Sequence, residues 1–324
     1  MSIIVTGAAG FIGRAVAERL LQRGESVVGV DIFNAYYEPA LKEARAADLA
    51  RFPAFRMVRA DIADAQVMED LVRQAGAKRM VHLAAQAGVR YSIENPFAYE
   101  RSNLAGHLSV LEACRRAPGF EHLVYASSSS VYGERPADGA AFREDEPAVS
   151  QVSLYAATKR SAELMSGAYA KLYGTPQTGL RFFTVYGPWG RPDMAYFSFT
   201  RKILAGETIQ VFGMGEMARD YTYVDDIVDG VIGALDRPPG PAENRILNIG
   251  DNRPVGLMDM IGVLEKALGR EARKEFLPMQ PGDVTATFAD ISKLNALTGY
   301  APKVSLEQGL PRFVDWHRAY TAAS

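Results

Sequence analysis

Ile3-Ile4-Val5-Thr6-Gly7-Ala8-Ala9-Gly10-Phe11-Ile12-Gly13 is the stretch that decides the fold. An apolar run leads into three glycines spaced G-x-x-G-x-x-G, and a helical pattern follows from Phe11 to Arg23. Glycines let a backbone turn tightly and approach a pyrophosphate, while the N-terminus of the following helix offers free N–H groups to it. A glycine motif alone is weak evidence, but its place between a strand and a helix predicts a dinucleotide site. The alternative is that these glycines serve only close packing of the helix on the strand.

A second strand, from Ser26 to Asp31, ends in a carboxylate that can accept hydrogen bonds from both hydroxyls of a ribose. The same carboxylate would repel a 2′-phosphate, and the next residues, Ile32-Phe33-Asn34, supply no cation to offset that repulsion. We therefore expect NAD rather than NADP as the cofactor, and no metal. After a third strand, Asp61-Ile62 is expected to contact the adenine, although Asp61 could equally cap a helix that starts at Ala63.

Short apolar runs alternate with helical patterns through the first half of the chain. Strands are expected at residues 2–6, 26–31, 54–59, 79–83, 122–127 and 178–183. Strands that are apolar throughout and separated by helices predict a parallel sheet covered on both faces. After Gly187, turns rich in Gly and Pro separate shorter elements, and Arg245 to Ile249 reads as a strand that returns to the main sheet.

These patterns predict an α/β fold, a Rossmann-type doubly wound parallel sheet with a smaller C-terminal substrate domain. Residues 1–187, with a returning segment near 220–250, are expected to form the NAD-binding domain. Residues 188–324 are expected to form mainly the domain that binds the substrate.

Composition excludes several other classes of protein. The 36 Lys and Arg residues nearly balance the 38 Asp and Glu residues, which argues against a nucleic-acid partner. No apolar stretch is long enough to span a membrane, and the N-terminus does not resemble a signal peptide. The single cysteine, Cys114, lies in a helical pattern and is expected to be a buried small side chain. We expect the protein in the cytoplasm.

Tyr155 and Lys159 lie four residues apart, and so on one face of a predicted helix. A nearby ammonium favours the phenolate, so the pKa of Tyr155 is expected to fall and Tyr155 to act as a base on a sugar hydroxyl. Such a pair is common on ordinary surface helices, but its position after the fifth strand favours a catalytic role. That strand ends in Ser127-Ser128-Ser129-Ser130, whose hydroxyls would reach the crevice at the carboxyl edge of the sheet.

These features together resemble the extended short-chain dehydrogenase/reductase family, which includes nucleotide-sugar epimerases, dehydratases and decarboxylases. The resemblance runs from Ile3 to about Trp316. It rests on Gly7, Gly10, Gly13, Asp31, Leu83-Ala84-Ala85, the group of Ser128, Tyr155 and Lys159, and the stretches 181–188 and 219–226.

The resemblance implies a role for each matching residue. Tyr155 would be the base, Lys159 its partner, and Ser128 the hydroxyl that steadies the reacting oxygen. Arg219 and Asp283 match positions that hold the diphosphate and the uridine ribose of a nucleotide sugar. The expected cofactor contacts are Gly7, Gly10, Phe11, Ile12, Gly13, Asp31, Asp61, Ile62, Leu83, Ala84, Ala85, Tyr155 and Lys159.

The family pattern also implies an oligomer. Two long helices, expected at Phe97 to Ala117 and Ser153 to Tyr173, match those through which family members pair in a four-helix bundle, so a homodimer is expected. Asn103 would either steady the active-site end of the first helix or satisfy a buried polar spot. Many relatives carry an arginine just before Pro281-Gly282-Asp283, which this chain lacks, so the diphosphate would depend on Arg219 with Arg90 or Lys202.

The residues beside Ser128 favour one reaction over the others. Dehydratases of the family carry an Asp-Glu pair where this chain has Ser129 and Ser130, and decarboxylases of UDP-glucuronate carry a glutamate at the position of Ser130. Neither serine ionises at neutral pH. Without an extra acid or base, a 4-keto sugar can turn over and be reduced on its other face, which is 4-epimerisation.

The run from Gly187 to Phe197 resembles that of UDP-glucuronate 4-epimerases. The carboxylate of a hexuronate requires a cation or several hydrogen-bond donors. The candidates are Arg90, Arg191, Ser127, Ser129 and Thr184, although Arg191 could instead pair with Asp193. The alternatives are a UDP-glucuronate decarboxylase, a UDP-glucose/galactose 4-epimerase and, outside catalysis, an NAD-sensing scaffold.

Overall fold

The computed structural model describes residues 2–133, 140–279 and 286–323. Its largest element is a parallel sheet with the strand order β10-β6-β5-β4-β1-β2-β3. These strands are β1 (Ser2–Thr6), β2 (Ser26–Asp31), β3 (Phe55–Arg59), β4 (Arg79–His82), β5 (His122–Ser128), β6 (Gln177–Phe182) and β10 (Asn244–Ile249). The order reverses between β1 and β4, and such a switch point opens a ligand crevice at the carboxyl ends of the strands. The predicted Rossmann-type fold is confirmed.

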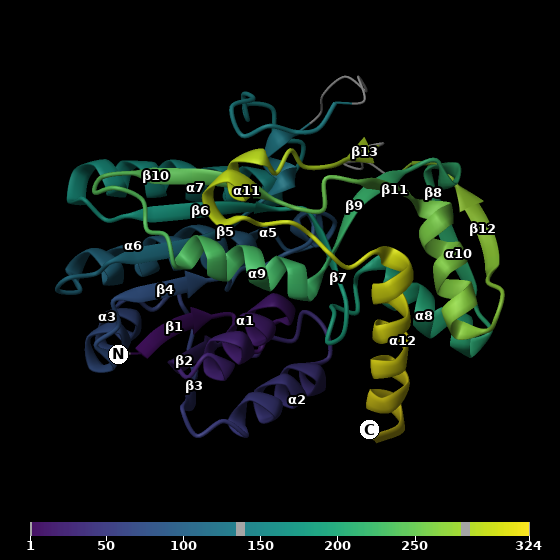
Figure 1. Cartoon of the computed structure of the whole chain (residues 1–324), viewed down its shortest axis with the longest axis horizontal. Coiled ribbons are helices and arrows are strands. Elements are labelled where there is room, and N and C mark those ends of the chain that lie inside the picture. Colours follow the sequence, from purple (N-terminus) through teal and green to yellow (C-terminus); the bar gives the residue numbers. More distant parts are fainter. Residues whose placement is uncertain (1, 134–139, 280–285, 324) are drawn as a thin grey trace.

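Helices cover both faces of this sheet (Figure 1). One layer contains α1 (Phe11–Gln22), α2 (Pro39–Ala50) and α9 (Val224–Leu235), and the other contains α3 (Ala65–Ala75), α6 (Gly106–Arg116) and α7 (Leu154–Tyr173). Successive side chains of a strand point to opposite faces. Accordingly Val5 and Val124 pack into one core cluster, while Ile4 and Leu123 pack into another. Burial on both faces explains why these strands are apolar without alternation.

The second half of the chain builds smaller sheets. β9 (Ala218–Tyr223) pairs with β7 (Thr184–Tyr186), β11 (Pro254–Gly256) and β13 (Ala286–Thr287), and β8 (Thr208–Phe212) pairs with β12 (Arg273–Leu277). The helices here are α8 (Ala195–Ala205), α10 (Leu257–Leu268), α11 (Ser292–Thr298) and α12 (Leu306–Ala323). Figure 1 shows α8, α10 and α12 gathered beyond one end of the main sheet. As predicted, the chain returns to that sheet, through β10. The division into two domains stays a prediction.

Two helices differ from their expected form. The predicted helix from Phe97 to Ala117 consists of α5 (Pro96–Tyr99), a π-helical turn (Glu100–Ala105) and α6. The helix expected from Ala63 starts at Ala65, and Asp64 caps it by accepting a hydrogen bond from the Val67 N–H at 3.1 Å. Asp61 is therefore not the cap, because an alternative carboxylate lies closer to the first turn.

Cys114 is completely buried, and burial raises the pKa of its thiol, as expected for a structural side chain rather than a nucleophile. Within the described ranges, no helix combines the length and the apolar character needed to cross a bilayer.

Candidate active site

A cavity of about 460 Å³ lies at the carboxyl ends of β1, β2, β4, β5 and β6. Most of the predicted site residues line it. They are Gly7, Gly10, Phe11, Ile12, Gly13, Asp31, Asp61, Ile62, Leu83, Ala84, Ala85, Ser127, Ser128, Ser129, Tyr155, Lys159, Thr184 and Arg191. The fold thus brings the glycine turn, the Tyr/Lys pair and all the predicted carboxylate-binding residues except Arg90 to one cavity.

The glycine turn at one end of the cavity has no room for side chains. A Cβ atom on Gly7, whose φ is +72°, would lie 2.8 Å from the Ala84 nitrogen, and one on Gly13 would lie 2.0 Å from the Gly7 oxygen. Helix α1 begins after Gly10, and no side chain caps its first N–H groups. A helix start with uncapped N–H groups and a positive dipole end fits a pyrophosphate.

The end of β2 fits a ribose. The Asp31 carboxylate accepts hydrogen bonds from the Ala9 N–H at 3.1 Å and the Phe33 N–H at 2.8 Å. Each oxygen has a further lone pair for a ligand hydroxyl. The structure also brings Lys42 of α2 to this part of the cavity, where its ammonium donates to the backbone and side-chain oxygens of Asn34.

The sequence alone does not predict this place for Lys42, because no local pattern connects a lysine on α2 with Asp31. Burial lowers the pKa of Lys42, and the charge of Asp31 partly offsets that effect. The residues that follow Asp31 in sequence supply no cation, as expected, but the fold brings the ammonium of Lys42 to the same part of the cavity.

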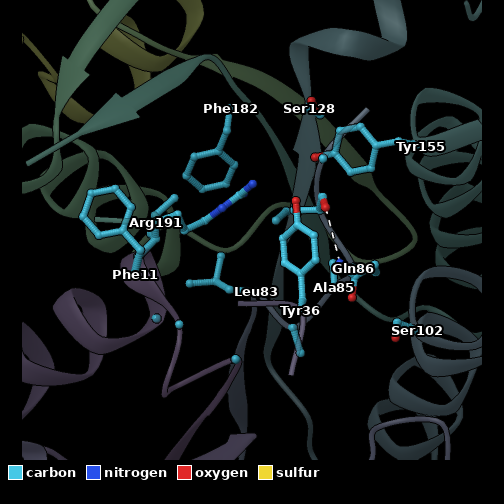
Figure 2. A pocket seen from close by; sticks show the side chains of 18 of the residues that line it. Phe11, Tyr36, Leu83, Ala85, Gln86, Ser102, Ser128, Tyr155, Phe182 and Arg191 are labelled. Atoms are coloured by element: carbon cyan, nitrogen blue, oxygen red, sulfur yellow. Dashed lines mark hydrogen bonds between the residues drawn. The ribbon is translucent and has the colours of Figure 1, made fainter. Parts of the chain in front are cut away.

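Tyr155 and Arg191 reach into the cavity from opposite sides, and Ser128 lies beside the tyrosine ring (Figure 2). Ser128 ends β5, and Ser153 caps α7 by accepting from the Ala156 N–H at 3.1 Å, which fixes Tyr155 in the first turn of that helix. The Ser130 hydroxyl donates to the Ser128 hydroxyl at 2.9 Å. The hydrogen bond between Ser128 and Tyr155 lowers the pKa of the phenol.

On balance, however, the pKa of Tyr155 is raised, because burial outweighs the effects of Ser128 and the charge of Arg191. The predicted fall in the pKa of Tyr155 is therefore not present in the chain alone. Lys159 does not produce it, because its ammonium instead donates to the Ala126 carbonyl at 2.9 Å. Burial lowers the pKa of Lys159 itself to about 8, with a smaller contribution from Arg191.

The π-helical turn links the loop after β4 to helix α7, which carries Tyr155 and Lys159. Asn103 accepts from the Gln86 N–H at 2.8 Å and donates to the Gln86 carbonyl and the Thr158 hydroxyl, both at 3.0 Å. Thr158 in turn donates to the Tyr155 carbonyl at 2.8 Å. Of the two roles considered for Asn103, the contacts favour steadying the site. π-turns often occur at functional sites.

The predicted carboxylate-binding residues differ in their contacts. Thr184 begins β7. Arg191 lines the cavity and forms an ion pair with Asp193, whose carboxylate accepts a hydrogen bond from the Arg191 Nε at 3.0 Å. Burial would raise the pKa of Asp193, but Arg191 lowers it overall. The Ser127 hydroxyl instead donates to the buried Glu163 at 2.6 Å. Ser127 therefore steadies β5 against α7, and its hydroxyl has no second proton to donate to a substrate.

Two predicted residues, Arg90 and Arg219, lie outside the cavity lining. Arg90 does not line the cavity, and its guanidinium lies 4.9 Å from the centre of the Phe212 ring. Arg219 does not line it either, and donates to the neighbouring Ala218 carbonyl at 2.8 Å. Asp283 falls outside the described residues. Asp61 lines the cavity and pairs with Arg101 at 2.7 Å.

Comparisons with known proteins agree with this geometry. Residues 3–250 match the model of the NAD dependent epimerase/dehydratase family. The chain is 46% identical to a probable UDP-glucuronate 4-epimerase of Rhizobium meliloti, covering 98% of this chain and 97% of that one. It is 45% identical to UDP-glucuronate 4-epimerase 4 of Arabidopsis thaliana, covering 99% of this chain and 76% of the plant protein.

Among solved structures, the UDP-glucuronic acid 4-epimerase of Bacillus cereus, in complex with UDP-glucuronic acid and NAD, superposes with a TM-score of 0.92. The two sequences are 36% identical, over 99% of this chain and 100% of that one. With its glycine turn, its Tyr/Lys helix and a family match over most of its length, this chain belongs to the NAD dependent epimerase/dehydratase family.

Proposed function

We propose that the chain is an NAD-dependent UDP-glucuronate 4-epimerase that interconverts UDP-glucuronate and UDP-galacturonate through a 4-keto sugar. One observation carries the proposal. Tyr155 and Arg191 face each other across one cavity, where Ser129 and Ser130 present hydroxyls and no ionisable acid. When bound along the glycine turn, NAD⁺ would take hydride from C4 of the sugar and return it to the opposite face.

The residues around Tyr155 would handle the proton of the 4-hydroxyl. Tyr155 takes this proton as base and returns it on reduction, while Ser128 holds the reacting oxygen. A neighbouring cation favours the phenolate, so the positive charge of the coenzyme ring would offset the burial that raises the pKa of Tyr155 in the chain alone. Lys159, already held at the Ala126 carbonyl, would bind the nicotinamide ribose.

Arg191, Thr184 and Ser129 would bind the sugar carboxylate. Arg191 shares its charge with Asp193, so this end of the cavity presents a nearly neutral pair together with hydroxyl donors. No side chain at positions 129 and 130 can act as acid or base at neutral pH, which disfavours loss of water from the 4-keto sugar. Arg219 and Asp283 are proposed for the UDP moiety on the family pattern alone.

We also propose that two chains pair through α6 and α7. Both helices carry exposed apolar side chains, namely Leu108 on α6 and Leu164 and Leu172 on α7. Exposed apolar groups on neighbouring helices favour a protein interface, as in a four-helix bundle. We further propose that the protein is located in the cytoplasm.

The test is incubation of the purified chain and NAD⁺ with UDP-glucuronate and, in a parallel reaction, with UDP-glucose, with the nucleotide sugars resolved by anion-exchange chromatography and NMR. UDP-galacturonate is the expected product. UDP-pentose would instead identify a decarboxylase, and turnover of UDP-glucose alone would identify a UDP-glucose/galactose 4-epimerase. If neither UDP-sugar is turned over, the result would support the alternative of an NAD-sensing scaffold.

The variant Tyr155→Phe tests the role of Tyr155 as the base. Removing the base should lower kcat by about 10²–10⁴-fold, while calorimetry should show NAD⁺ and UDP-glucuronate still bound. Native turnover by this variant would overturn the assignment of Tyr155 as the base.

A further inference from the structure

Arg45, on helix α2, is fully buried and far from the Tyr/Lys pair in sequence. Buried charges are usually paired with an opposite charge. The described hydrogen bonds of this guanidinium all go to neutral oxygens. Three of these five bonds go to one turn of the chain, at Trp189 and Gly190. Its Nε and Nη2 atoms donate to the Trp189 carbonyl at 3.1 and 2.6 Å, and Nη2 also donates to the Gly190 carbonyl at 2.9 Å.

The turn that Arg45 holds is strained. Trp189 has a φ of +63°, a left-handed conformation that residues with a side chain rarely adopt. At Gly190 a Cβ would lie 1.9 Å from the Tyr196 hydroxyl oxygen. Such a conformation persists only where the surroundings impose it. Three hydrogen bonds from one planar fork supply that constraint.

Arg191 follows this turn directly. Its guanidinium lines the cavity, and the backbone that carries it is fixed at the two preceding carbonyls. We propose that Arg45 is a positioning residue that holds Arg191 in place to bind the carboxylate of the sugar acid. This inference rests on the proposed function.

Arg45 also reaches the cofactor end of the cavity. Its Nη1 atom donates to the Ala9 carbonyl in the glycine turn at 3.1 Å, and the Ala9 N–H donates to Asp31. One side chain therefore ties the turn expected to hold the coenzyme to the turn that carries Arg191. A displacement of either turn would alter the distance between Arg191 and the coenzyme, and so the position of the reacting carbon relative to the coenzyme.

The experiment compares two ligands that differ only in the carboxylate. In the Tyr155→Phe background, with NAD⁺ saturating, titration calorimetry measures the dissociation constants of UDP-glucuronate and UDP-glucose. Arg45→Lys keeps the charge but cannot span the two carbonyls. We expect it to weaken UDP-glucuronate binding about tenfold and UDP-glucose binding less than about twofold. With Tyr155 restored, the same substitution should increase UDP-pentose release per epimerisation.

Two further variants keep the test decisive. Gly190→Ala pushes the same turn from the side of Tyr196 and should reproduce the selective loss, even if Arg45→Lys folds poorly. Arg51→Lys, on an exposed arginine at the end of α2, should leave both dissociation constants unchanged. Equal weakening of both ligands, or no change, in Arg45→Lys and Gly190→Ala would overturn the inference. A parent chain that does not epimerise UDP-glucuronate would refute the proposed function before any Arg45 variant is compared, and the inference with it.

Discussion

At the scale of single residues, Thr184 illustrates what the carboxylate end of the cavity must achieve. Oxidation of glucuronate at C4 gives a β-keto acid, which loses CO₂ most readily when the bond to the carboxylate stands perpendicular to the ketone plane. Thr184 lines the cavity at the start of β7, and Arg191 lines it too. We propose that these residues keep the carboxylate away from that geometry until hydride returns.

Thr184→Val removes the hydroxyl and keeps the shape of the side chain. A hydrogen bond to a charged group contributes about 1.5–3 kcal/mol, so UDP-pentose release relative to epimerisation should rise about tenfold or more. Product ratios from NMR time courses measure the effect, and Thr184→Ser, which keeps the hydroxyl, serves as control. An unchanged ratio in Thr184→Val would refute this role.

Gly13 provides a second prediction at this scale, because its hydrogen faces the backbone of the same turn. Gly13→Ala would place a methyl group 2.0 Å from the Gly7 oxygen, which should displace the turn and abolish NAD⁺ binding in a fluorescence titration. Gly262→Ala, in helix α10 with no atom near the added methyl, should bind NAD⁺ normally and gain about 0.5–1 kcal/mol of stability. Normal NAD⁺ affinity in Gly13→Ala would contradict the proposed role of the turn.

At the scale of whole elements, α7 presents two different faces. Inward-facing residues of α7 include Lys159 and the buried Glu163, which accepts two hydrogen bonds from Arg181 at 2.8 and 2.9 Å. Outward-facing residues include Leu164, with 58% of its surface exposed. A helix fixed to the active site on one side and to a second chain on the other would keep the catalytic turn rigid.

Leu164→Glu places a charge in the proposed interface and should convert the dimer into a monomer. Analytical ultracentrifugation over a range of concentrations measures the change in mass. Leu204→Glu, on α8 and also partly exposed, should leave the mass unchanged. A parent chain that sediments as a monomer would refute the interface.

At the scale of the whole molecule, four buried histidines make the fold sensitive to acid. Burial lowers the pKa of His107 to about 3 and that of His122 to about 4, places that of His82 well below its usual value, and also lowers that of His317. The unfolded chain binds protons at these positions below about pH 6.5, whereas the folded chain does not. The free energy of unfolding should therefore fall as the pH drops from about 6.5 towards 4.

Asp220 acts in the opposite direction, because burial raises its pKa to about 6 and the folded chain takes up a proton there first, and burial raises the pKa of Asp225 and Asp251 as well. Each histidine contributes up to about 1.4 kcal/mol per pH unit near pH 5, and the four histidines together outweigh the three aspartates. Urea unfolding at several pH values measures this slope, and His122→Gln should reduce it by about 1.4 kcal/mol per unit. Stability that stays constant down to pH 5 would contradict these pKa shifts.

Much of the site could be predicted because it follows from local patterns. The glycine turn, Asp31 and the Tyr155/Lys159 pair each lie at the end of a strand or the start of a helix, where the chain itself sets the geometry. Lys42 and the π-helical turn around Asn103 could not be predicted in this way. Their roles depend on which elements pack together, and helical periodicity does not distinguish a π-turn from an α-turn.

The sequence by itself determined the parallel sheet, the order of its helices and the chemical types of the catalytic side chains, because these depend on hydrophobic period and on residues close together in the chain. Only the tertiary structure decided which cations reach the cavity. It excluded Arg90 and Arg219 from the lining, brought in Lys42, and fixed Arg191 through the distant Arg45. Long flexible side chains on separate elements gain their positions from packing and hydrogen bonds that form when the elements meet.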